Sequence, residues 1–329
     1  MPTWFSAIRV RFSSCIALVL LIHGAPALAD EAWPSRPVRF VVGVQPGGTN
    51  DAIARSIAKA LSERIGQPAL VENRPGASGN IGAEYVMRSA PDGYTFYVPT
   101  SSIAIRPALY KEMSFSFTKD FKAVALLAKV PNIISVNPAV PVSNLKELIE
   151  YSKKNPGLVT YGSGSAGSSG HITAESIKLA TGADWRHVPY KGIAGALNDV
   201  MAGHIKAVVD NLPSSLPLVR NGSLKPIAVT GAARSPLLPQ VPTVAESGLP
   251  GFEMVAWFGL IAPRDTPQPI VDRVNAAVAD ALGNRDLRTQ FAREGADSSP
   301  MNPEEFHNYI VSETAKWGDI VRKANVTLN

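Results

Sequence analysis

The chain has 329 residues, of which 32 are basic and 27 acidic, giving a net charge of +5 at pH 7. Two of the basic residues and none of the acidic ones lie in the first 29 residues, so the remainder carries 30 basic against 27 acidic residues. This weak, scattered excess argues against a protein that binds nucleic acid or a membrane surface. The length allows one large or two medium-sized domains.

Residues 1–29 have the layout of a secretory signal peptide. Two arginines precede the apolar run CIALVLLI, and the segment ends in Ala-Leu-Ala. The run is well short of the roughly 20 residues needed to span a bilayer. Cys15 is the only cysteine and lies at the start of this run. We therefore expect an exported protein without disulfides or a lipid anchor.

Apolar periodicity and turn residues predict strands and helices that alternate along the rest of the chain. The expected strands are at 38–44, 69–73, 94–98, 132–136, 158–161, 185–190, 205–210, 225–229 and 253–263. The expected helices are at 53–65, 80–90, 144–154, 171–180, 267–283 and 303–324. Ser143 is the expected N-cap of the third helix, residues 211–219 are expected to form a turn, and the Pro- and Gly-rich residues 234–252 a long ordered loop.

This alternation predicts an α/β fold with a parallel, doubly wound sheet. Glycine- and serine-rich turns at 46–51, 99–102 and 162–170 all follow predicted strands. In open α/β sheets, ligands bind outside the carboxyl ends of the strands. These turns are therefore the candidate binding loops.

The third of these turns, Gly162 to Gly167, matches the G-x-G-x-x-G pattern of dinucleotide-binding loops. A dinucleotide site also needs an acidic residue at the end of the next strand, and Asp184 instead precedes that strand. Backbone amides at a helix start bind any anion, so the loop is either an anion site or a plain turn. No cofactor is expected.

Enzyme and metal motifs are missing. No G-x-S-x-G elbow surrounds the serines at 163–169. A catalytic triad can also be built from residues that are distant in sequence. A secreted α/β hydrolase is therefore the alternative function. The histidines form no metal-binding pair, and His171 is expected to be a structural residue of a first helical turn. Neither a metal site nor a catalytic residue is expected.

Three further residues permit two interpretations. Asp210 ends a predicted strand, so it either faces a ligand cleft or caps the following turn. Trp257 and Trp317 are expected to be core aromatics in preference to a stacking platform for a ligand.

Seven segments, taken in order, resemble the extracytoplasmic solute receptors of tripartite tricarboxylate transporters, also called Bug receptors. The segments are PVRFVVGVQPGGTNDAIAR, VENRPGASGNIGAEYV, PDGYTFYV, VPYKGIAGALNDVMAGHI, VPTVAESGLPGFE, WFGLIAPRDTP and AKWGDIVRKA. The resemblance covers nearly all of the chain after residue 29.

The resemblance implies a monomeric periplasmic receptor of the two-lobed type II class, in which each lobe is a mostly parallel sheet flanked by helices. Such a receptor closes on a small carboxylic acid and delivers it to a membrane permease. The implied first lobe is 32–130 plus 253–329, and the implied second lobe is 131–252. The ligand-binding residues expected from the resemblance and from the loops are Val44, Gly47, Gly48, Ser101, Ser102, Ser163, Gly167, Ser168 and Asp210.

Two positions depart from the family pattern. Val44 stands where the family usually has an aromatic residue, and Ser165 stands where it more often has glycine. We expect these changes to alter the lining of the pocket and to leave the binding of a carboxylate group intact.

Overall fold

The computed structural model describes residue 1, residues 33–110, residues 113–323 and residue 326. The expected signal peptide therefore lies outside the described part, apart from Met1. The chain divides into two compact units, Met1–Trp33 and Pro34–Asn329, and the second contains all the elements discussed below. None of the described helices has the length and apolar character needed to span a bilayer.

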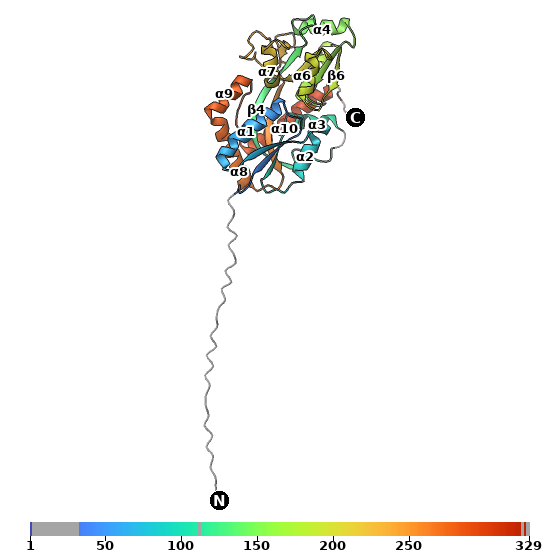
Figure 1. Ribbon diagram of the computed structural model, residues 1–329. Coiled ribbons are helices and arrows are strands. Elements are labelled where there is room, and N and C mark those ends of the chain that lie inside the picture. The colour runs from blue at the N-terminus through green and yellow to red at the C-terminus, as the bar shows by residue number, and fades with distance from the viewer. Residues whose placement is uncertain (2–32, 111–112, 324–325, 327–329) are drawn as a thin grey trace. The chain divides into compact units, whose positions relative to one another are not determined.

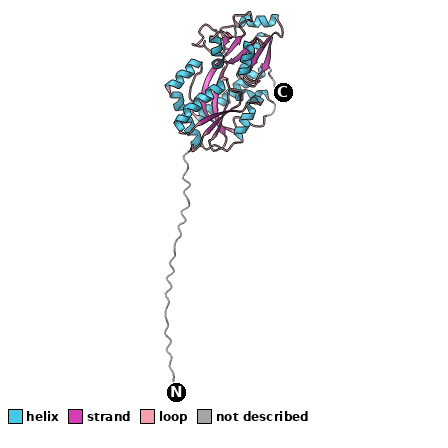
Figure 2. Ribbon diagram, viewed as in Figure 1, coloured by secondary structure: helices cyan, strands magenta, loops and turns pink. Residues whose placement is uncertain are grey.

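Strands and helices alternate through most of this unit (Figures 1 and 2). The strands are β1 (Val38–Val42), β2 (Ala69–Asn73), β3 (Thr95–Val98), β4 (Phe121–Val136), β5 (Val159–Ser163), β6 (Trp185–Pro189), β7 (Ala207–Asn211), β8 (Lys225–Val229) and β9 (Val255–Pro263). The helices are α1 (Thr49–Ile65), α2 (Asn80–Met87), α3 (Ser102–Leu109), α4 (Leu145–Lys154), α5 (Ser169–Thr181), α6 (Ile193–Met201), α7 (Leu212–Arg220), α8 (Gln268–Gly283), α9 (Arg285–Glu294) and α10 (Pro303–Lys323), with a 3-10 turn at Ala77–Gly79 before α2.

Two groups of strands are joined through β4. In the first group β1 pairs in parallel with β2 and β3, and β9 pairs antiparallel with β3 and β4. In the second group β5 pairs in parallel with β6 and β7, while β7 and β8 pair antiparallel with β4. In Figure 1, α4, α6 and α7 lie with the second group, and α1, α2, α3 and α8 lie with the first.

β4 is long because it belongs to both groups. Its residues from Phe121 to Pro131 pair with β9, and those from Asn132 to Val136 pair with β7 and β8. The sequence predicted only the second part, 132–136. The strands around β1 and β5 are parallel and the connecting strands β4 and β9 are antiparallel, which agrees with the expectation of mostly parallel sheets.

Two local predictions were wrong. The expected turn at 211–219 is helix α7, because Pro213 lies in the first turn of the helix, where proline is tolerated. The N-cap of α4 is Asn144 in place of Ser143, since its side chain accepts a hydrogen bond from the amide of Glu147. Residues 234–252 form an irregular segment of turns, as predicted.

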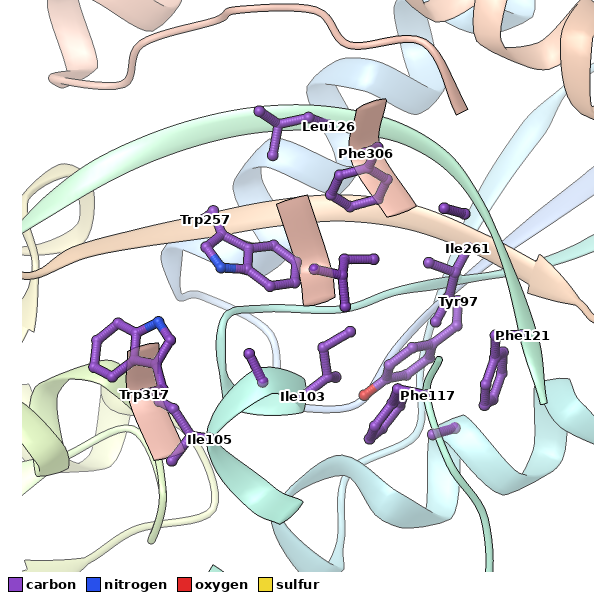
Figure 3. Packing of buried hydrophobic residues seen from close by; sticks show 14 of the residues in the cluster. Tyr97, Ile103, Ile105, Phe117, Phe121, Leu126, Trp257, Ile261, Phe306 and Trp317 are labelled. Carbon is purple, nitrogen blue, oxygen red and sulfur yellow. The ribbon is translucent and has the colours of Figure 1, made fainter. Parts of the chain in front are cut away.

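One hydrophobic cluster contains both tryptophans that were expected to be core aromatics (Figure 3). Trp257 of β9 and Trp317 of α10 are at most 1% exposed. Trp257 packs edge-to-face on Phe306 with ring centroids 5.8 Å apart. Truncating a buried aromatic of this size to alanine typically costs about 3–5 kcal/mol. This cluster fixes the ends of β3 and β9, which border the cleft described next.

Candidate functional site

A cleft of about 80 Å³ lies where the carboxyl ends of the parallel strands of both groups meet. The loops after β1, β3, β5 and β6 and the carboxyl end of β7 all contribute to its walls, as expected for an open α/β sheet. The 3-10 turn before α2 and strand β9 complete the lining. Of the predicted site residues, the cleft is lined by Val44, Gly48, Ser101, Ser102, Ser168 and Asp210.

Helix N-termini converge on this cleft from both groups of strands. The N-cap residues of six helices line it: Gly48 of α1, Gly79 of α2, Ser101 of α3, Ser168 of α5, Gly192 of α6 and Asn211 of α7. Only Ser168 satisfies an amide of its own helix with its side chain. Aligned peptide dipoles make these termini attractive to an anion. The first amides of α3 are already occupied, because those of Ser102 and Ile103 donate to Thr100.

The loop after β1 brings backbone to the cleft wall. Gly43 has no room for a side chain, because an added Cβ would lie 2.5 Å from the Tyr97 hydroxyl. Gly48 has an extended conformation and begins α1 without a side-chain cap. Asn50 donates from Nδ2 to the carbonyl of Val98 at 3.3 Å, and its buried Oδ1 has no partner among the described residues. The loop therefore offers amides and one unused acceptor.

Gly47 is not brought into the cleft lining. Its amide donates to Asp51 Oδ2 at 3.3 Å, and the same carboxylate accepts from Arg55 Nε at 3.0 Å. Asp51, in the first turn of α1, thus shapes the loop from outside the cleft.

The loop after β3 contributes two serines and an arginine. Ser101 is 1% exposed, and its hydroxyl has no partner among the described residues. Ser102 Oγ accepts from Thr100 Oγ1 at 2.8 Å and from Arg106 Nη2 at 3.1 Å. Sequence reasoning missed Arg106, which is the only Lys or Arg side chain among the described residues that line the cleft.

The serine-rich loop after β5 presents Ser165 and Ser168 to the cleft and keeps Ser163 and Gly167 behind it. Ser163 is fully buried, where its hydroxyl contacts His187 Nε2 at 2.8 Å and donates to the carbonyl of Ser165 at 3.0 Å. The amide of Gly167 donates to His171 Nδ1 at 3.0 Å. These two predicted residues hold the loop in shape from its rear.

Two stacked histidines support that loop. The rings of His171 and His187 lie 4.0 Å apart, at an angle of 17°. Burial lowers the pKa of His171 to about 4, and burial together with the neighbouring His171 lowers the pKa of His187 to about 3. Both rings are therefore neutral at pH 7. The expectation that His171 is a structural first-turn residue agrees with its place in α5.

Asp210 combines both roles that its sequence position allowed. It lines the cleft at the end of β7, and its carboxylate accepts from Ser214, and from Ser215 at 2.9 Å, in the first turn of α7. Burial raises the pKa of Asp210 to about 6, although these hydrogen bonds oppose the rise. A carboxylate this close to neutral pH can change its protonation state when an anion enters the cleft.

The two sides of the cleft touch at its rim. The amide of Gln45 donates to the carbonyl of Lys191 at 3.4 Å. A Cβ added to Gly48 would lie 2.9 Å from Ile193 Cγ2, so the loop after β1 lies directly against the start of α6. Glycine at position 48 therefore permits the two sides to approach.

The geometry does not favour the other functions considered for the serine loop. Asp184 accepts from the amide of Gly157 at 2.8 Å, so it has a local structural role and does not end β6 as a ribose ligand would. The Ser163–His187 contact resembles half of a catalytic triad, but Ser163 is buried and does not line the cleft. Within the described residues, no group of His, Cys, Asp and Glu side chains could hold a metal ion.

Fold and cleft together define a two-lobed binding protein of the type II periplasmic class, with α/β lobes on either side of the ligand site. A protein of R. palustris solved with adipate is 40% identical, with a TM-score of 0.87 over 90% of this chain and 100% of that one. MatC of Rhodopseudomonas palustris, solved with bound malate, is 32% identical, with a TM-score of 0.83 over 88% of this chain and 99% of that one.

The sequence comparisons agree with the structural ones. BugT of Bordetella pertussis is 34% identical over 97% of this chain and 98% of that protein. The profile of the tripartite tricarboxylate transporter family receptor matches residues 53–326. The chain belongs to this receptor family, which confirms the resemblance drawn from its sequence motifs.

Proposed function

We propose that the protein is a periplasmic receptor that binds a small carboxylic acid in the cleft between its lobes and delivers it to a membrane permease. The observation that carries this proposal is the convergence of six helix N-termini on one cleft. Each terminus is equivalent to roughly half a positive charge, and free amides there suit a carboxylate as well as they suit a phosphate. The solved relatives that contain adipate and malate give further support.

The proposed ligand contacts are those predicted residues that line the cleft. Gly48 would offer its backbone amide at the start of α1. Ser101, Ser102 and Ser168 would offer hydroxyl groups, since the amide of Ser168 already donates to the carbonyl of Ser165 at 3.1 Å. Asp210 would accept from a ligand hydroxyl or from a bridging water. Val44 would cover the carbon chain of the ligand. Gly47, Ser163 and Gly167 are assigned to the support of the loops, because each donates to a neighbouring side chain or backbone group.

We assign lobe one to 32–130 plus 253–329 and lobe two to 131–252. The crossing of β4 from its pairing with β9 to its pairing with β7 and β8 at Pro131–Asn132 supports this division. Closure of the two lobes would bury the acid and present a new surface to the permease. The protein would act as a monomer, without catalysis, after removal of residues 1–29 during export.

Thermal unfolding with a panel of mono-, di- and tricarboxylates and aromatic acids tests the proposal. A ligand that binds only the folded state raises the unfolding temperature by mass action, so one or a few acids should give a clear increase. Amines and neutral sugars of similar size are the controls. No increase with any acid, or turnover of an acid or its ester, would contradict a receptor for carboxylates.

Delivery to a permease needs a separate measurement. Cells that carry the gene for this chain should take up the radiolabelled acid that raises the unfolding temperature most, and cells without the gene should lose that uptake. Equal uptake in both would leave binding intact and contradict delivery.

A further inference from the structure

Arg106 is a buried cation that lines the cleft without an acidic partner. The residue is 2% exposed on α3. Its Nη1 donates to Asn80 Oδ1 at 2.8 Å, and its Nη2 donates to Ser102 Oγ at 3.1 Å and to the carbonyl of Ser78. All of these acceptors are neutral. No carboxylate among the described residues forms an ion pair with Arg106, and its Nε has no hydrogen-bond partner there.

The guanidinium is held in a fixed orientation. Ser78 has a positive φ of 54°, a backbone conformation that non-glycine residues seldom adopt. The bond from Arg106 to its carbonyl contributes to holding it there. At the next position, an added Cβ on Gly79 would lie 3.0 Å from Arg106 Nη2, so glycine leaves room for the charge. A cation fixed in this way needs little reordering when an anion binds.

Arg106 and Asp210 line the cleft from different lobes of the proposed division. Arg106 is bonded to Ser102 and to the turn before α2, in lobe one. Asp210 is bonded to the first turn of α7, in lobe two. No hydrogen bond among the described residues links Arg106 and its partners to Asp210 and its partners. An acid held by the amide of Gly48 and the hydroxyl of Ser168 leaves the charge of Arg106 without a counterion, unless the ligand carries a second anionic group.

We propose that Arg106 binds the second carboxylate of the ligand, so that the receptor selects dicarboxylates over monocarboxylates of the same length. This inference rests on the proposed function, because it assigns a substrate class to the same cleft. An unpaired buried charge is unfavourable, and a guanidinium can donate two parallel hydrogen bonds to a carboxylate. A monocarboxylate can satisfy this amide and hydroxyl or Arg106, but not both.

Isothermal titration with matched pairs of acids tests the proposal: adipate against hexanoate, and succinate against butyrate. For at least one pair, we expect the wild-type protein to bind the diacid at least 30-fold more tightly than the monoacid. Arg106→Gln should reduce the affinity for that diacid at least tenfold and change the affinity for the monoacid less than threefold. Arg39→Gln, which removes the same charge from an exposed position on β1, should change neither.

Each alternative outcome has a distinct meaning. Equal binding of diacid and monoacid by the wild-type protein would overturn the inference and leave the proposed function standing. An equal loss of affinity for the diacid and the monoacid in Arg106→Gln would show that Arg106 only shapes the turn before α2. That result would also overturn the inference. Binding of no acid at all would overturn both proposals.

A second variant covers the possibility that Arg106→Gln fails to fold. Asn80→Ala removes one neutral acceptor of the guanidinium and keeps the positive charge. The preference for the diacid should persist in Asn80→Ala and weaken as salt is added, since charge pairing is screened by ions. A preference that salt does not change would contradict recognition by charge.

Discussion

Thr49 Oγ1, in the first turn of α1, donates to Ser214 Oγ of α7 across the cleft at 3.0 Å. Ser214 in turn donates to the carboxylate of Asp210. Because an ionised carboxylate only accepts hydrogen bonds, the Ser214 proton points to Asp210 and the Ser214 oxygen is free to accept from Thr49. The two lobes are thus joined by a short chain of directed hydrogen bonds that ends on a cleft residue.

This relationship predicts that Ser214→Ala weakens ligand binding by about fivefold, the equivalent of one hydrogen bond of about 1 kcal/mol. The variant removes a contact that exists only when the lobes are together. Ser215→Ala is the matched control, because Ser215 also donates to Asp210 but does not contact Thr49. Titration with the acid that raises the unfolding temperature most measures both. Equal losses in the two variants would assign the effect to Asp210 and not to the bond between the lobes.

Gly48→Ala should weaken binding by about tenfold or more while the unligated protein keeps its unfolding temperature. The added Cβ would lie 2.9 Å from Ile193 Cγ2, whose β-branched side chain has little freedom to move away. Gly283→Ala is the control, since a Cβ there meets nothing within 4 Å. If Gly48→Ala binds as tightly as the control, the loop after β1 does not need to approach α6.

Stability should fall as the pH is lowered from 6.5 towards 4. The folded-state pKa of His171, about 4, lies below the ordinary value of 6.5, so the unfolded chain binds more protons in this interval. Because a tenfold change in proton affinity is equivalent to about 1.4 kcal/mol, the shift of His171 should lower the free energy of unfolding by about 3 kcal/mol between pH 7 and pH 4. His187 acts in the same direction, whereas the raised pKa of Asp210 opposes them.

Urea unfolding at pH 7, 6, 5 and 4 measures this dependence. His187→Gln should flatten the curve, and Asp210→Asn should steepen it, because the asparagine variant removes the opposing contribution. If the free energy of unfolding of the wild-type protein does not change with pH in this range, the two histidines are not buried in their neutral form.

Ligand binding should take up a fraction of a proton near pH 6.5. The pKa of Asp210, already raised to about 6, should rise further when an anion enters the same cleft, since like charges disfavour the ionised form. Calorimetry in two buffers of different ionisation enthalpy measures the uptake. Asp210→Asn should abolish it at this pH, and an unchanged uptake in that variant would assign the proton to another group.

Elements with strong local patterns could be predicted from the sequence. The expected strand at 225–229 coincides with β8. Helix α3 was missed because its sequence, SIAIRPAL, is short and contains Pro107, and α7 was taken for a turn because of Pro213 and Pro217. In these helices tertiary packing outweighs a weak or negative local propensity.

The sequence predicted which loops line the cleft more accurately than it predicted which residues of those loops do so. Gly48, Ser168 and Asp210 line the cleft because strand ends and helix starts can be located from local patterns. Ser163 was expected in the same lining, but its hydroxyl is occupied by His187, 24 residues away. Arg106 gave no local signal, since its role depends on acceptors 26 and 28 residues earlier in the chain.

The passage of β4 through both groups of strands has an evolutionary consequence. In the proposed division, both the first strand, β1, and the last helix, α10, belong to lobe one, so the segment between Pro131 and Val255 would be an insertion with a single entrance and a single exit. Recombination that replaces this segment with that of a relative exchanges the serine-rich loop and Asp210 together and keeps Arg106. We expect such chimaeras to acquire new ligand preferences in one step. The preference for a second carboxylate, which we assign to Arg106, should stay unchanged.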